Sequence, residues 1–96
     1  MLAPIALERS IALLGTSDDP ELAYAHLELG KVLLDLDVSR AEKHLRSALE
    51  LYERTEQPVG IAVSYRVLGD LLRVAGDAAA GCESYRTGIL AIEPLL

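Results

Sequence analysis

Two segments of this chain repeat one pattern of large and small residues. They read YAHLELGKVLLDL and VSYRVLGDLLRVA, and the pair Leu29-Gly30 of the first lies 39 residues before Leu68-Gly69 of the second. A glycine in the interior of a helix costs about 1 kcal/mol relative to alanine. Its recurrence in two otherwise helical segments indicates that each helix is approached closely by a neighbour, which needs the missing side chain.

The segments that follow repeat as well, at an offset of 40 residues. The matching positions are Ala41, Leu45 and Ala48 in the first copy and Gly81, Tyr85 and Gly88 in the second. Small residues recur at the positions where two helices would touch, and a large residue fills the space beside them. The chain is therefore expected to contain two pairs of helices.

Helix starts and stops divide the whole chain. We expect helices at about 3–14, 20–35, 39–54 and 58–75, and a fifth from Asp77 to the residue before Pro94. Ser39 with Glu42 fits a capping box, and Gly76 can end the fourth helix in the left-handed conformation. No Trp or Phe is present, and Leu, Ala, Ile and Val dominate the 51% of hydrophobic residues. The fold class is predicted to be all-α with five helices.

At these residues the sequence resembles the tetratricopeptide (TPR) repeat family. That family places a large residue, Leu-Gly and a second large residue on one helix, a small–aromatic–small series on the next, and then a proline. The second copy supplies Tyr65, Leu68-Gly69, Leu72, Gly76-Asp77, Gly81, Tyr85, Gly88 and Pro94; the first supplies His26, Leu29-Gly30, Leu33, Ala41, Leu45 and Ala48. The period of 39–40 exceeds the usual repeat of about 34 residues, as in the longer repeats of kinesin light chain and some bacterial regulators.

The resemblance implies a short right-handed solenoid of stacked antiparallel helical hairpins. Residues 1–96 would form a single domain, with a leading helix at 3–14, repeat one at 20–54 and repeat two at 58–93. The first helix of each repeat would line a concave groove that binds a partner. The implied lining residues are Tyr24, Leu27, Lys31, Val63, Arg66, Asp70 and Arg73.

Three of those residues form a charged ladder on one helical face. Arg66, Asp70 and Arg73 are spaced at i, i+4 and i+7. The ladder can be a partly basic slot for an acidic or extended peptide. Alternatively, it is a solvated face whose charges are tied to one another, each pair contributing a few tenths of a kcal/mol.

The two ends of the array are expected to be apolar and open. Helical repeats bury their faces against neighbours, so terminal repeats normally carry a polar capping helix. Here both ends carry large aliphatic residues: Ile5 and Ile11 at the start, and Ile89, Ile92, Leu95 and Leu96 at the end. These residues predict self-association, and the chain is expected to be a homo-oligomer or a segment of a longer array.

Several functions are disfavoured by composition and motifs. A net charge of −6 argues against binding to nucleic acid or an anionic membrane, and the first residues resemble no signal peptide. Cys82 has no second cysteine for a disulfide, so a cytoplasmic location is expected. No nucleophile or phosphate-binding motif is present. His26 is expected in a packed position and His44 facing solvent, so we expect no catalysis, metal or cofactor.

We therefore expect a non-catalytic TPR-type module that binds a protein or peptide, as a segment of a larger cytoplasmic scaffold or regulator. The alternative is a ligand-sensing or dimerisation segment of a bacterial transcription regulator, in which a ligand shifts an equilibrium between assemblies.

Overall fold

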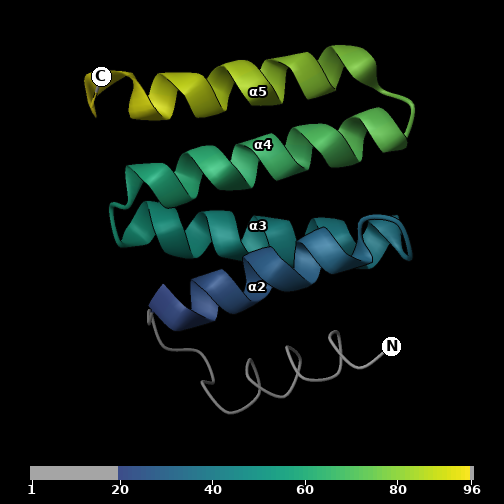
Figure 1. The fold of residues 1–96 in the computed structure, drawn as a ribbon, viewed down its shortest axis with the longest axis horizontal. Coiled ribbons are helices and arrows are strands. Elements are labelled where there is room, and N and C mark those ends of the chain that lie inside the picture. Colours follow the sequence, from purple (N-terminus) through teal and green to yellow (C-terminus); the bar gives the residue numbers. More distant parts are fainter. Residues whose placement is uncertain (1–19, 96) are drawn as a thin grey trace.

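The computed structural model of the chain describes residues 20–95. Within them four α-helices follow one another: α2 (Pro20–Leu33), α3 (Val38–Arg54), α4 (Pro58–Val74) and α5 (Ala78–Ile92), with a short 3-10 helix, η1 (Glu93–Leu95), at the end. Consecutive helices are antiparallel and lie side by side (Figure 1), and α2 also touches α4. The all-α prediction is confirmed. Residues 20–95 contain four α-helices, whereas five were predicted for the whole chain. The leading helix expected at 3–14 lies outside the described residues.

The turns between helices are set by caps and by one left-handed glycine. Gly76 has φ +92°, as expected for the residue after α4. The carboxylate of Asp77 accepts a hydrogen bond from the Ala80 amide at 3.0 Å, which confirms Asp77 as the N-cap of α5. The predicted cap at Ser39 is wrong. Asp37 caps α3 instead, because its carboxylate reaches the Arg40 amide at 3.2 Å.

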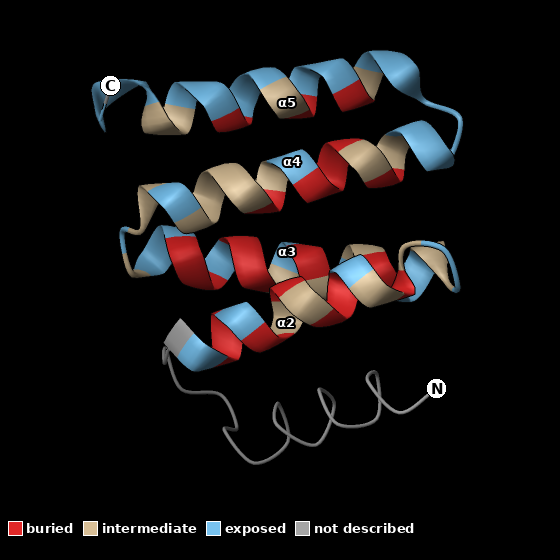
Figure 2. Ribbon diagram, in the orientation of Figure 1, coloured by how far each residue is buried: buried red, intermediate tan, exposed pale blue. Residues whose placement is uncertain are grey.

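The core runs along the inner faces of α2, α3 and α4. Leu29, Leu45 and Leu71 are at most 2% exposed and belong to one hydrophobic cluster. Figure 2 shows that burial is densest on α2 and α3 and that much of α5 is exposed. The last helix therefore contributes one face to the interior and leaves the other to solvent.

Glycines lie at the closest contacts between paired helices. A Cβ atom on Gly30 would lie 2.7 Å from Cδ2 of Leu45. A Cβ atom on Gly69 would lie 2.5 Å from Cε1 of Tyr85 and 3.0 Å from the carbonyl oxygen of Gly81. Real Cβ atoms do not approach other atoms so closely, so the expected reason for both glycines is confirmed.

Candidate functional site

The predicted groove residues are divided between α2 and α4. Tyr24 and Lys31 of α2 are exposed, as are Arg66 and Arg73 of α4, while Val63 and Asp70 are half-buried. Leu27 differs from the expectation, because it is only 4% exposed and belongs to the hydrophobic core. Its side chain is therefore part of the packing and does not line an open surface.

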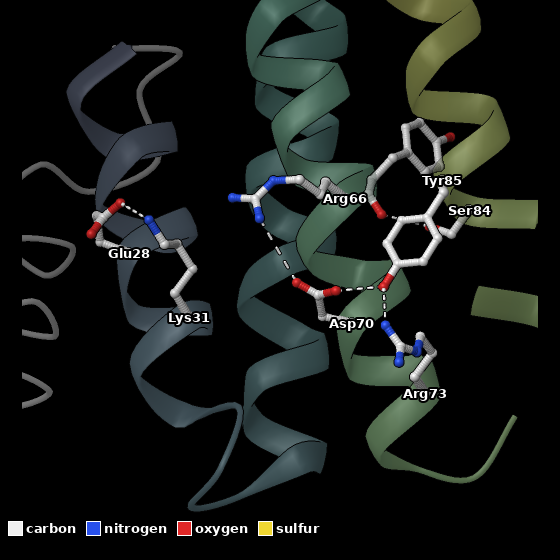
Figure 3. A network of polar contacts seen from close by, with 8 residues as sticks. Glu28, Lys31, Arg66, Asp70, Arg73, Ser84 and Tyr85 are labelled. Atoms are coloured by element: carbon white, nitrogen blue, oxygen red, sulfur yellow. Dashed lines mark hydrogen bonds and ion pairs between the residues drawn. The ribbon is translucent and has the colours of Figure 1, made fainter. Parts of the chain in front are cut away.

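The charged ladder is tied to α5 by a tyrosine. The hydroxyl of Tyr85 donates a hydrogen bond to Asp70, and Nη1 of Arg73 donates to the same hydroxyl at 3.5 Å. Arg66 pairs with the other oxygen of Asp70 at 3.9 Å. The hydrogen bond with Tyr85 and the nearby Asp70 raise the pKa of Arg73 above its usual value. Figure 3 shows these side chains on α4 and α5, and the ion pair of Glu28 and Lys31 on α2.

An apolar hollow of about 420 Å³ lies between α4 and α5. Its lining consists of Ala62, Val63 and Arg66 from α4 and Tyr85, Gly88, Ile89 and Ile92 from α5. Of these, the side chain of Ile89 is 61% exposed. The hollow thus combines the predicted groove residues Val63 and Arg66 with the predicted self-association residues Ile89 and Ile92.

The residues of α3 that correspond to Ile89 and Ile92 are buried. Leu49 and Tyr52 lie 40 residues before Ile89 and Ile92, yet they are only 8% and 6% exposed. The ring of Tyr52 lies against Gly60 of α4, where a Cβ atom would clash with it. Helix α4 therefore covers on the first pair the surface that remains open on the second.

Two histidines from different helices are in contact. Nδ1 of His26 and Nδ1 of His44 are 2.9 Å apart, and the ring centres are 5.2 Å apart. The expectation that His44 faces solvent is wrong, since the ring is half-buried between α2 and α3. Burial, and secondly the neighbouring His44, lower the pKa of His26. The contact can be anticipated only from the turn between α2 and α3, because His26 and His44 lie at similar distances from it on two antiparallel helices.

The predicted self-association residues are partly within the described chain. Ile89 and Leu95 are exposed by 61% and 60%, and Ile92 is half-buried. Ile5, Ile11 and Leu96 lie outside the described residues. Cys82, on the same helix as Ile89, carries an exposed free thiol.

None of the helices in residues 20–95 has the length and apolar character needed to cross a membrane. Over the same residues, no three His, Cys, Asp or Glu side chains are grouped so as to hold a metal ion. No family model, no curated protein and no solved structure matches this chain.

Proposed function

We propose that this chain is a non-catalytic, TPR-type protein-binding module that takes a helical segment of a partner protein into the hollow between α4 and α5. The observation that carries the proposal is the contrast between the two helix pairs. Tyr52 is buried against Gly60 of α4, whereas Ile89 and Ile92, at the corresponding end of α5, line an open hollow. Because a helix, α4, packs at the corresponding position of the first pair, we expect a helix to bind at the open position of the second pair.

The lining of the hollow supports an apolar ligand with a polar edge. Burying an exposed isoleucine such as Ile89 stabilises a complex by up to about 1.5–3 kcal/mol. Arg66 lines the same hollow and keeps its charged group exposed, with Asp70 at 3.9 Å as its partner. A ligand carboxylate at this edge would compete with Asp70 for Arg66, which favours a helix with an acidic residue beside its apolar stripe.

A second small feature also favours a helix over a bulky ligand. Gly88 lies in the floor of the hollow, and a Cβ atom there would be 3.0 Å from the carbonyl oxygen of Ala62. The close contact of α4 and α5 therefore sets the depth of the hollow. An apolar surface between two helices matches the apolar stripe of a third helix.

The test uses a labelled peptide with the sequence of α4, residues 58–74, because this helix occupies the corresponding surface on α3. Fluorescence anisotropy of the peptide is measured against the full chain. We expect saturable binding that Ile89→Glu weakens by about tenfold or more, a change of about 1.4 kcal/mol or more. Thr87→Glu, on the same helix and exposed but outside the hollow lining, is the matched control and should leave binding unchanged.

The proposal is contradicted by either of two results. One is the absence of saturable binding to the wild-type chain. The other is equal binding to wild type and Ile89→Glu, provided that circular dichroism shows both chains equally helical.

A further inference from the structure

One flank of α5 carries an uncharged stripe with regular spacing, in which Cys82 and Ile89 are exposed and Tyr85 and Ile92 are half-buried. Its members are Ala78, Cys82, Tyr85, Ile89 and Ile92, which recur at intervals of four, three, four and three residues. This is the spacing of a seam between two packed helices. None of the five is charged, although 24 of the 96 residues of the chain are charged.

The two ends of the stripe differ in size, and the largest side chain, Tyr85, lies at its centre. The first two positions, Ala78 and Cys82, are small, and the last two, Ile89 and Ile92, are large. In an antiparallel pair of identical helices, the small half of one stripe meets the large half of the other. The stripe of α5 is thus complementary in shape to an inverted copy of itself.

Helix α4 uses the same arrangement to pack on α3. Its residues Gly60, Ser64, Val67 and Leu71 are spaced by four, three and four, with the small residues first. Ser64, Val67 and Leu71 are at most 2% exposed. Gly60 lies against the ring of Tyr52, so the small end of the α4 stripe meets a large residue near the end of antiparallel α3.

The register of that contact can be transferred to α5. Tyr52 corresponds to Ile92 by the 40-residue offset, and Ala78 stands at the start of the α5 stripe as Gly60 stands at the start of the α4 stripe. Placing Ala78 of one copy against Ile92 of another brings the two Tyr85 residues together. Because both copies then use the same residues in the same way, the contact closes on itself around a two-fold axis.

We propose that the helix bound by the open face of α5 is α5 of a second copy of this chain, antiparallel and centred on Tyr85. The inference rests on the proposed function, since it names the occupant of the same apolar surface. In this arrangement Cys82 of each copy lies opposite Ile89 of the other. The dimer covers the exposed isoleucine side chains at the end of each helix bundle.

A cysteine cross-link tests the register. In Ile89→Cys, the native Cys82 of one copy lies opposite the introduced thiol of the other, so mild oxidation should give a covalent dimer joined twice between positions 82 and 89. Within one chain these positions are about 10 Å apart along the helix, too far for an internal disulfide. Peptide mapping by mass spectrometry identifies the linked positions.

Two matched variants complete the cross-linking test. Thr87→Cys introduces an exposed thiol on another side of α5 and should give little covalent dimer. The double variant Cys82→Ser with Ile89→Cys should also fail, because the two copies of position 89 lie about 12 Å apart along the axis in this register. A dimer linked between the two copies of position 89, or equal yields from all three variants, overturns the antiparallel arrangement.

Light scattering of Cys82→Ser over a concentration series tests the dimer without disulfides. We expect a mass that rises to two chains and stops there, and Ile89→Glu should raise the dissociation constant about tenfold or more while Thr87→Glu leaves it unchanged. A mass of one chain at every concentration, or growth beyond two chains, overturns the inference. A monomer that still binds the α4 peptide would overturn the dimer and leave the proposed function standing, whereas a monomer that binds no α4 peptide would contradict both.

Discussion

Gly69 of α4 faces the ring of Tyr85 on α5 so closely that a single added carbon would lie 2.5 Å from the ring and 3.0 Å from the backbone of Gly81. The ring of Tyr85 could avoid this carbon only by leaving its position against Gly69, and the carbonyl oxygen of Gly81 could move only if the whole helix shifted. Gly69 thus determines how near the last helix lies, and with it the depth of the hollow beside Tyr85.

Replacement of Gly69 by leucine should therefore destabilise the chain. Overpacking of a close contact costs about 1–3 kcal/mol or more, which exceeds the gain of about 1 kcal/mol in helix propensity. We expect the melting temperature to fall by about 5–15 °C, as followed by circular dichroism. Ala79→Leu, at an exposed position of α5, is the matched control. An unchanged or higher melting temperature for Gly69→Leu would show that the two helices do not need to approach so closely.

Two buried serines should respond in opposite ways to alanine. Ser84 donates a hydrogen bond to the carbonyl oxygen of Tyr65 at 2.7 Å, so Ser84→Ala should lower the free energy of unfolding by about 0.5–1.5 kcal/mol. The hydroxyl of Ser64 is buried and has no hydrogen-bond partner among the described residues. Ser64→Ala removes that unpaired group and should be neutral or stabilising by up to about 1 kcal/mol. Urea denaturation of the two variants checks this. A larger loss of unfolding free energy for Ser64→Ala than for Ser84→Ala would contradict this assignment of the hydrogen bond to Ser84.

Stability should fall as the solution is acidified through the range in which histidine titrates. The pKa of His26 in the folded chain is below its ordinary value of 6.5 because burial, and then His44, disfavour the charged ring. Between these two pKa values the unfolded chain binds more protons than the folded chain, so unfolding becomes easier as the pH falls. The contribution is fully present above about pH 6.5 and is lost as the pH falls through the folded pKa.

Nuclear magnetic resonance of the imidazole protons measures this directly. His26 should titrate below pH 6.5 in the wild type, and His44→Gln should move its pKa upward by removing one of the two causes. Urea denaturation from pH 8 to pH 5 should show a weaker pH dependence for His26→Leu. A measured pKa of 6.5 or above for His26 would contradict its half-buried contact with His44.

The roles of some residues could be predicted from the sequence alone. Gly30, Gly69, Gly76 and Asp77 act through local geometry or a small-residue pattern, and each was assigned correctly. Leu27 was placed wrongly. Whether such a side chain is buried depends on whether a following helix covers it, and helical spacing alone does not predict this. The corresponding residue after 39 positions, Arg66, remains exposed.

Contacts between distant residues were the other limit. His26 and His44 meet because α2 and α3 cross at that depth, and Tyr85 reaches Asp70 because α5 lies against α4. Spacing along one helix does not report either contact. The hollow between α4 and α5 could likewise be anticipated only as a set of exposed residues, since its shape comes from the packing of two helices.

The most direct test of the proposed binding surface is a nuclear magnetic resonance titration of the isotope-labelled full chain with the α4 peptide. If the hollow is the binding site, amide signals of Val63, Arg66, Ile89 and Ile92 should shift together and saturate with one affinity, while those of Leu33 and Ala41 stay in place. Shifts confined to α2 and α3, or no saturable shifts around the hollow, would contradict the account.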